Sequence, residues 1–366
     1  MDAELCSAIP FAGWSSEASV SELRAHKHNM KTKRVGVLMG GPSSEREISI
    51  KSGKAVCKAL EAKKIEYIPI ELMPGSNTHS YGKLVTDLIN RMKIDVAFIA
   101  MHGEFGEDGT VQALLEKMNI PYTGSRSSAS RVAMNKITAK EVFKSTGIPI
   151  AKHEILEKDK FTKYFDAKKH FKDLGQSIVV KPSNGGSSIG LNIANNEAEL
   201  SASIKDAFKY DDKVIIEEYV PGREITVGIV EDRAMPIVEI VPKSRFFDFT
   251  AKYEKGLTEY IVPAGIEEKM SLLCQDISLR AHKALAARSF SRVDIILHKV
   301  KGPVVLELNT IPGLTETSLL PKAARAAGIE FEDLCIKILN SAYPTPGVAV
   351  RQLLELDRLG SSKWSR

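Results

Sequence analysis

Two carboxylates stand opposite each other in a predicted β-hairpin, RVDIILHKVKGPVVLELN, which runs from Arg292 to Asn309. If the turn is centred between Val300 and Lys301, Asp294 faces Glu307, and Arg292 faces Asn309 on the same side of the hairpin. Directly opposed side chains have Cβ atoms about 5 Å apart. The other side of the hairpin receives only apolar side chains: Val293, Ile295, Leu297, Val304, Leu306 and Leu308.

Opposed carboxylates repel each other, so this arrangement needs a cation. Oxygen ligands of this kind suit Mg²⁺, which proteins commonly hold with one or two carboxylates and the phosphates of a substrate. A solvated polar face is the alternative interpretation. The uniformly apolar opposite face and the nearby amide favour a metal site, which we assign to Asp294, Glu307 and Asn309.

A second chemical feature is the segment KPSNGGSSIG at residues 181–190, which follows an apolar strand. Lys181 at the end of the strand and the backbone amides of residues 184–190 could surround phosphate oxygens. The lysine precedes the glycines, so this is not a Walker A motif. Alone, such a loop is more often a plain connection. Together with a metal hairpin, it predicts a nucleotide phosphate site.

These features must be positioned by a chain of 366 residues, which is long enough for two or three domains. Its net charge of +5 is too small to indicate a nucleic-acid partner. The four cysteines form no CxxC pair, and no apolar run approaches the roughly 20 residues of a membrane span. The N-terminus does not resemble a signal peptide. We therefore expect a cytoplasmic protein without a membrane or nucleic-acid partner.

Strands and helices alternate from residue 31, which predicts an α/β domain with a parallel sheet, followed by two domains of mixed α+β character. Expected helices include residues 43–64, with Ser43 or Ser44 as N-cap, and one continuous helix at 127–147. The expected divisions are an extension at 1–30 that is disordered, with Met30 as an alternative start, and then 31–126, 127–221, 222–343 and a tail at 344–366.

Seven segments in chain order resemble the D-alanine–D-alanine ligase family of the ATP-grasp superfamily: GGPSSEREIS, MHGEFGEDGT, PYTGS, MNK, VVKPSNGGSSIG, FDFTAKY and ELNTIPGLTETSL. The resemblance covers roughly residues 33–342. It implies a three-domain ATP-grasp fold and a homodimer. It also implies an enzyme of peptidoglycan precursor synthesis that phosphorylates the carboxylate of one D-alanine and lets the amine of a second attack.

The resemblance also implies roles for residues that bind the amino acids. Glu45 would bind the first ammonium group, within a network with Ser187 and Tyr253, and His102 would lie beside the first carboxylate. On residue type alone, His102 reads as an ordinary histidine at a strand end. Arg292 and the backbone N–H of Gly313 would form the oxyanion hole. Lys252 would contact phosphate, and Ser318 would bind the carboxylate of the second substrate. Residues 244–262 would form a closing loop.

For the nucleotide, the resemblance implies phosphate contacts from Lys136, Lys181 and the amides of the loop with Ser187 and Ser188. It implies that adenosine lies against Glu217, Tyr219, Val220 and Glu224. Asp294, Glu307 and Asn309 would hold two Mg²⁺, with Mn²⁺ as a substitute, and a monovalent cation is a further expected ligand.

Three other functions are compatible with parts of the pattern. One is an ATP-grasp ligase with another acceptor, such as D-lactate, although Tyr253 favours D-alanine. Another is a nucleotide-binding regulator without catalysis, against which the retained site residues argue. The third, a dehydrogenase, lacks the dinucleotide-binding fingerprint.

Overall fold

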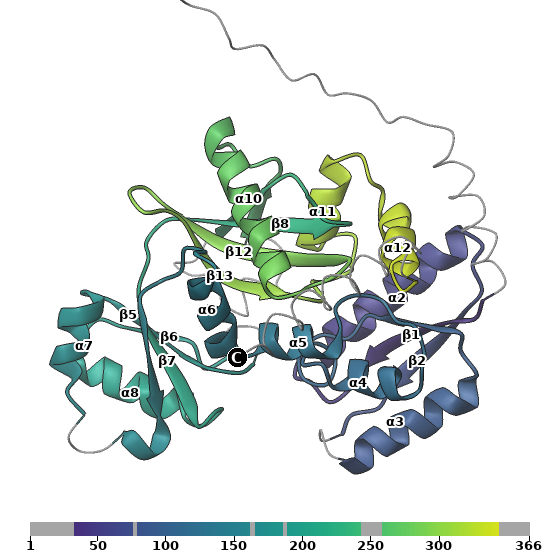
Figure 1. Ribbon diagram of the computed structural model, residues 1–366, viewed down its shortest axis with the longest axis horizontal. Coiled ribbons are helices and arrows are strands. Elements are labelled where there is room, and N and C mark those ends of the chain that lie inside the picture. The colour runs from purple at the N-terminus through teal and green to yellow at the C-terminus, as the bar shows by residue number, and fades with distance from the viewer. Residues whose placement is uncertain (1–32, 76–78, 162–164, 186–188, 243–257, 344–366) are drawn as a thin grey trace, which may run out of the picture.

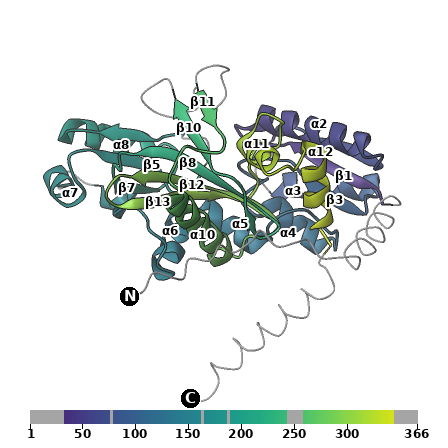
Figure 2. The ribbon, with the colours of Figure 1, turned by 90° about the horizontal axis from the view of Figure 1, so that it is seen from above.

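The computed structural model describes residues 33–75, 79–161, 165–185, 189–242 and 258–343, and these ranges form three sheets in chain order (Figures 1 and 2). Ser187, Ser188, Lys252 and Tyr253 lie outside the described residues, as do the expected extension and tail. Within the described ranges, no helix has both the length and the apolar character needed to cross a bilayer.

The N-terminal sheet is parallel, with strand order β2-β1-β3. Its elements are β1 (Val35–Gly40), α2 (Arg46–Ala62), β2 (Tyr67–Leu72), α3 (His79–Met92), β3 (Val96–Ile99) and α4 (Thr110–Lys117). One face packs on α2 through a core that includes Val56 and Leu60, and the other packs on α3 and α4 through Val85 and Leu115. This confirms the expected parallel α/β unit.

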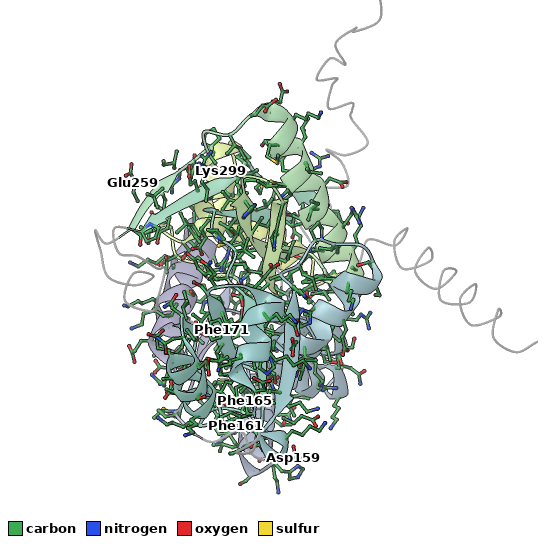
Figure 3. All side chains as sticks on the ribbon, turned by 90° about the vertical axis from the view of Figure 1, so that its left-hand side faces the viewer. Asp159, Phe161, Phe165, Phe171, Glu259 and Lys299 are labelled. Atoms are coloured by element: carbon green, nitrogen blue, oxygen red, sulfur yellow. The ribbon has the colours of Figure 1, made fainter. Side chains whose placement is uncertain are left out.

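The central sheet is antiparallel, with strand order β4-β7-β5-β6. Its elements are β4 (His153–Glu157), the short helix η1 (Lys158–Lys160), α7 (Ala167–Leu174), β5 (Ile178–Pro182), β6 (Asn192–Ala194), α8 (Glu197–Ala207) and β7 (Lys213–Glu218). Apolar side chains of α7 and α8 cover one face. Phe161, Phe165 and Phe171 close that core at the outer end of the sheet, where Figure 3 labels them.

The C-terminal sheet has strand order β11-β10-β8-β12-β13, with β9 paired to β8. Its strands are β8 (Arg223–Val230), β9 (Arg233–Ala234), β10 (Val238–Pro242), β11 (Thr258–Ile261), β12 (Phe290–His298) and β13 (Gly302–Asn309). The helices around it are α5 (Ser127–Met134), α6 (Lys136–Ser145), α10 (Glu268–Ala284), α11 (Leu319–Ala326) and α12 (Phe331–Asn340).

Two hydrophobic cores hold this sheet in place. One face packs against α10 and α6, where Phe143 and Ile277 meet Val293 of β12. The other core joins the C-terminal part to the N-terminal sheet, because Leu334 of α12 and Leu320 of α11 pack in the same cluster as Val56 of α2. In Figure 2, α12 and α2 lie side by side at this junction. The two sheets that flank the junction are therefore held together by buried apolar surface.

The predicted register of the β12–β13 hairpin is confirmed where the polar residues lie. Asp294 pairs with Glu307, and Arg292 pairs with Asn309. The register shifts after Asp294, so that Ile295 pairs with Val305 and not with Leu306, the partner that the sequence predicted, and Val305 is buried in the core beneath the hairpin. A β-bulge that inserts one residue reverses the side-chain faces beyond it, and this explains the error near the turn.

Three other expectations about helices need correction. The continuous helix predicted at 127–147 is divided at Asn135, which leaves α5 and instead caps α6 by accepting the Thr138 N–H at 3.0 Å. The helix predicted with Ser43 or Ser44 as N-cap begins at Arg46, with Glu45 in the capping position, although the Ser43 hydroxyl does accept the Glu45 N–H. The helices α3 and α11 were not predicted.

Candidate active site

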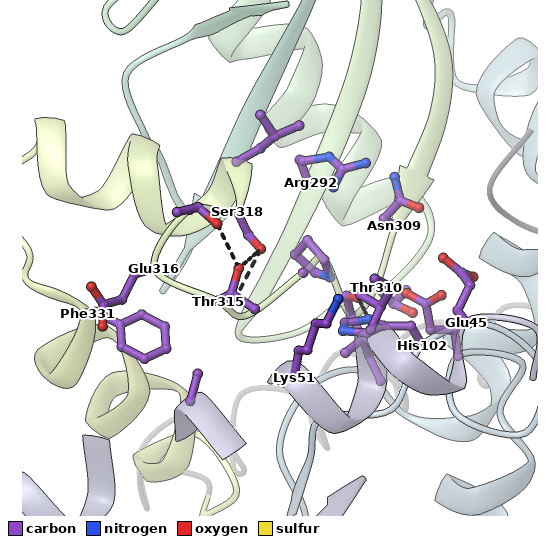
Figure 4. Close-up of a pocket in the computed structure, with 18 of the residues that line it drawn as sticks. Glu45, Lys51, His102, Arg292, Asn309, Thr310, Thr315, Glu316, Ser318 and Phe331 are labelled. Atoms are coloured by element: carbon purple, nitrogen blue, oxygen red, sulfur yellow. Dashed lines mark hydrogen bonds between the residues drawn. The ribbon is translucent and has the colours of Figure 1, made fainter. Parts of the chain in front are cut away.

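A cavity of about 890 Å³ lies where the N-terminal and C-terminal parts of the molecule meet (Figure 4). Its wall is built from the start of α2, the loop after β3, the end of β13 and the segment leading into α11. Eight of the residues that the sequence assigns to the site line this cavity: Glu45, His102, Lys136, Arg292, Glu307, Asn309, Gly313 and Ser318. Segments that lie more than 250 residues apart in the chain therefore meet around a single space.

Arg292 and Asp294 are joined by two parallel hydrogen bonds. The guanidinium donates from Nε to Oδ1 and from Nη2 to Oδ2 of Asp294, both at 2.8 Å. Asp294 also accepts from Thr226 Oγ1 at 2.6 Å and from Asn309 Nδ2 at 3.1 Å. Burial alone would lower the pKa of Arg292, but Asp294 and Glu307 outweigh burial and raise it. A permanent cation is thus hydrogen-bonded to Asp294 and interacts electrostatically with Glu307.

Acidic groups and a histidine surround the inner end of the cavity. Glu107 accepts the Gly103 N–H at 2.8 Å, and its burial together with the nearby Glu45 raises its pKa to about 8. His102 is 4% exposed, and burial lowers its pKa although Glu45 acts in the opposite direction. The imidazole is therefore neutral near pH 7. Glu45, at 9% exposure, lines the cavity at the start of α2, and Glu107 also lines it.

A buried charge cluster lies on the inner face of the central sheet. Glu217 of β7 forms ion pairs with Lys181 of β5 and, at 2.9 Å, with Lys140 of α6. Burial would raise the pKa of Glu217, but the two ammonium groups outweigh burial and lower the pKa to about 2. Burial lowers the pKa of Lys140, against the attraction of Glu217. Lys181 and Glu217, both predicted to bind the nucleotide, are thus in contact with each other. Lys140, which the sequence analysis did not select, completes the cluster.

Lys136 reaches the small-residue loop that follows β5. Its Nζ donates to the carbonyl oxygen of Gly185, and its backbone N–H donates to the Ser183 carbonyl at 2.9 Å. The base of the loop is held by Asp211, which accepts from the Ser183 hydroxyl at 2.6 Å and from the Asn184 N–H at 2.9 Å. Lys136 and the described start of this loop, both assigned to ATP phosphates from the sequence, are therefore in contact.

The remaining predicted nucleotide residues lie on the connection between the central and C-terminal sheets. Tyr219 and Val220 follow β7 directly, and Glu224 is the second residue of β8. Val220 is buried against Ala151 and Val304, whereas Tyr219 is 38% exposed. The apolar side chain of Val220 therefore lies where the chain crosses from the central to the C-terminal sheet. Along the chain it is flanked by two acceptor residues, Glu217 and Glu224.

The segment after β13 ends at a helix N-terminus that faces the cavity. Ser318 immediately precedes α11, and its hydroxyl contacts the Thr315 hydroxyl at 2.8 Å (Figure 4). A side chain at Gly313 would meet the Ser318 hydroxyl at 2.8 Å from Cβ, so the backbone must approach closely there. The N-terminus of a helix attracts anions such as carboxylates.

Several functional candidates were not found from the sequence. Lys140 lies one helical turn after Lys136, and Glu107 lies in the quoted GEDGT segment, but neither position by itself indicates a buried contact. The spacing of Lys136 and Lys140 on one helix face was the available signal. Their partners are contributed by distant strands.

The fold and site define an ATP-grasp ligase. The family model described as D-ala D-ala ligase C-terminus matches residues 142–340, and the corresponding N-terminus model matches 34–81 and 73–125. The chain is 42% identical over 313 residues to a D-alanine–D-alanine ligase of Geotalea uraniireducens, covering 86% of this chain and 96% of that protein. It is 43% identical over 317 residues to the Geobacter sulfurreducens enzyme, with the same coverage.

Two solved structures are also similar. The D-alanine–D-alanine ligase of Bacillus anthracis, complexed with ATP, matches with a TM-score of 0.72 and 34% identity, over 88% of this chain and 99% of that one. The VanG D-Ala:D-Ser ligase of Enterococcus faecalis matches with a TM-score of 0.71 and 26% identity, over 85% and 99%. The chain belongs to the D-alanine–D-alanine ligase family.

Proposed function

We propose that this protein joins two D-alanine molecules into D-alanyl-D-alanine for peptidoglycan precursors, with ATP converted to ADP and phosphate. A carboxylate is a poor electrophile. In the first step a carboxylate oxygen of D-alanine attacks the γ-phosphorus, the bond to ADP breaks, and an acyl phosphate forms. In the second step the amine of another D-alanine adds to the acyl carbon, loses a proton, and phosphate leaves with its bridging oxygen.

The arrangement around Arg292 is the observation that supports this proposal most directly. The guanidinium is partly buried, bears a permanent charge and lines the cavity beside Glu307 and Asn309. A preorganised donor of this kind stabilises the oxyanion that develops when an amine adds to an acyl carbon. We assign the second donor to the backbone N–H of Gly313.

Asp294, Glu307 and Asn309 form a set of hard oxygen donors that fits Mg²⁺ or Mn²⁺. The pairing of Asp294 with Glu307 supports this assignment, because Arg292 supplies one positive charge for the two carboxylates and leaves a net negative charge for a metal ion to neutralise. Within the described ranges, no cluster of three or more His, Cys, Asp or Glu side chains is arranged for a metal. Substrate phosphates would complete the ligand set. Bound there, two ions would neutralise charge on the transferring phosphoryl group.

The two amino acids would lie at opposite ends of the cavity. Glu45 would hold the ammonium group of the first D-alanine, and the N-terminus of α11 with Ser318 would hold the carboxylate of the second. The distribution of charge supports this orientation, since a carboxylate lies at one end and a helix N-terminus at the other. Roles for Ser187, Lys252 and Tyr253 follow from the sequence resemblance alone.

ATP would lie between the central and C-terminal sheets. Lys136 and the loop that includes Ser188 would contact its phosphates, and Lys181 would approach from β5. The connection between β7 and β8 would hold the adenosine, with Tyr219 and Val220 against the base and Glu217 and Glu224 as acceptors. The apolar contact of Val220 with Val304 supports the assignment of this wall to the base.

Other parts of the proposal rest on the family resemblance. They are a cytoplasmic homodimer, a monovalent-cation requirement, and division into units at 31–126, 127–221 and 222–343. The acceptor is the most informative choice to test, because VanG is a D-Ala:D-Ser ligase. The experiment incubates the protein with ATP, Mg²⁺ and D-alanine, with D-serine or D-lactate added in parallel reactions. Equal amounts of D-alanyl-D-alanine and phosphate support the proposal, and a mixed product in preference to the homodipeptide contradicts it.

A further inference from the structure

Three hydrogen bonds enclose the turn at residues 311–314, which follows β13. His102 Nδ1 lies 2.9 Å from the carbonyl oxygen of Ile311. His102 Nε2 lies 2.8 Å from the hydroxyl of Ser52, and that hydroxyl oxygen accepts the backbone N–H of Leu314 at 3.3 Å. We call these contacts the 311–314 ring. Its side chains come from α2 and the loop after β3, so the N-terminal part of the molecule holds a turn of the C-terminal part.

The chemistry of the groups fixes the direction of each hydrogen bond. A carbonyl oxygen can only accept, so Nδ1 of His102 carries the hydrogen. In the neutral ring Nε2 then accepts from the Ser52 hydroxyl, whose oxygen accepts from Leu314. Ser52 and Leu314 are fully buried, and the backbone N–H of His102 is itself bound to the Ser49 hydroxyl at 2.9 Å. Water therefore cannot readily replace any member of the ring.

Gly313 lies inside the enclosed turn. The fixed carbonyl of Ile311 precedes the Pro312–Gly313 pair, and the fixed N–H of Leu314 follows it. Pro312 has no N–H, so the Gly313 amide is the donor between these fixed points that can face the cavity. Glycine has the greatest backbone freedom of any residue, so its amide direction depends on its neighbours.

We propose that Ser52 and His102 are positioning residues that aim the Gly313 amide at the oxyanion, with His102 acting through the 311–314 ring rather than through contact with substrate. The inference rests on the proposed ligase function. Both ring nitrogens of His102 already have protein partners, which leaves neither available for a carboxylate. A displacement of about 1 Å in a catalytic donor can cost on the order of 100-fold in rate.

The first test compares Ser52→Ala with Ser278→Ala. Ser278 is also a fully buried helical serine, and its hydroxyl donates to the Cys274 carbonyl at 2.7 Å, far from the ring. We expect Ser52→Ala to lower kcat by roughly 10- to 100-fold, with the Kd for ATP changed less than about twofold. Ser278→Ala should keep the wild-type kcat. An unchanged kcat in folded Ser52→Ala protein, or an equal loss in both variants, overturns the inference.

The second test is a double-mutant cycle with His102→Asn. The asparagine amide can replace Nδ1 as the donor to Ile311 but is too short to reach Ser52. If the ring acts as a unit, the double variant loses clearly less activity than the product of the two single losses. If the fold-loss of activity in the double variant equals the product of the two single fold-losses, Ser52 and His102 act independently and the inference is wrong.

The third test does not depend on activity. Hydrogen exchange of a peptide covering 310–316 is measured without substrates in wild type, Ser52→Ala and Ser278→Ala. We expect exchange on the order of 10-fold faster in Ser52→Ala alone. Equal exchange in all three proteins overturns the inference, whichever reaction the enzyme performs. If the exchange responds but the wild type forms no dipeptide, the proposed function fails and the ring keeps its structural role.

Discussion

Lys140 and Glu217 form an ion pair at 2.9 Å inside the protein, with side chains only 2% and 3% exposed. The second oxygen of the same carboxylate pairs with Lys181. One negative charge is thus shared by two ammonium groups at the edge of the proposed nucleotide site. Removing either partner of a buried ion pair leaves an uncompensated charge.

We predict that Lys140→Met weakens ATP binding and destabilises the protein. Glu217 would then depend on Lys181 alone, which would draw that lysine away from nucleotide phosphate. The loss in the free energy of unfolding should be about 3–5 kcal/mol. Calorimetric titration with ATP and urea unfolding measure both effects. Lys144→Met, an exposed change on the same helix, is the control. Equal results for both variants would show that the buried cluster does not support the site.

Arg292→Lys should lower kcat by roughly 100- to 1,000-fold, because an ammonium cannot make the two parallel bonds that the guanidinium makes to Asp294. The Kd for ATP should change by only a few-fold. Steady-state kinetics and equilibrium binding separate the two quantities. Wild-type turnover in the lysine variant would remove Arg292 from the oxyanion hole.

Glu307→Gln keeps the shape of the side chain and removes its charge. We expect turnover to fall by about 100-fold or more at any Mg²⁺ concentration, with a weaker dependence of ATP binding on Mg²⁺. Glu268→Gln, an exposed change on α10, should behave as wild type. A Glu307→Gln enzyme that matched this control across a Mg²⁺ titration would contradict the metal assignment.

His282 should make stability depend on pH. It is 1% exposed, and burial lowers its pKa from 6.5 to about 4, with Asp232 opposing the shift. Below pH 6.5 the unfolded chain takes up a proton that the folded protein refuses until about pH 4. The free energy of unfolding should therefore fall across this window by up to about 3 kcal/mol.

Replacement of His282 by Gln should flatten this pH dependence, as measured by urea unfolding at several values between pH 7 and pH 4. His79→Gln changes an exposed histidine and should leave the slope intact. A slope that stays the same in His282→Gln would assign the pH dependence to other groups.

The polar side of the β12–β13 hairpin could be predicted from sequence because strand alternation and one turn position determine which residues face each other. The bulge after Asp294 could not, because it depends on how Val305 packs against Ile295 and the core beneath. The helix α3 was missed for a similar reason. It contains Gly82, and it is stabilised by Tyr81, Val85 and Ile89 packing on the sheet.

The site residues divide in the same way, into those that could be selected from sequence and those that could not. Lys181, Glu307 and Asn309 lie in segments whose residue types suggest chemistry, so sequence reasoning could select them, whereas Lys136 is selected through the family resemblance. The importance of Lys140 and Ser52 arises from partners on distant elements, Glu217 and the turn that contains Leu314. No local pattern encodes such pairings, because they exist only after the three sheets have assembled.

The central claim is ligation through an acyl phosphate, and oxygen transfer tests it most directly. D-alanine labelled with ¹⁸O in both carboxylate oxygens is incubated with the protein, ATP and Mg²⁺, and the released phosphate and dipeptide are examined by mass spectrometry. The account predicts one ¹⁸O in each phosphate released and one in each new peptide carbonyl. Dipeptide formed with phosphate that carries no ¹⁸O would contradict it.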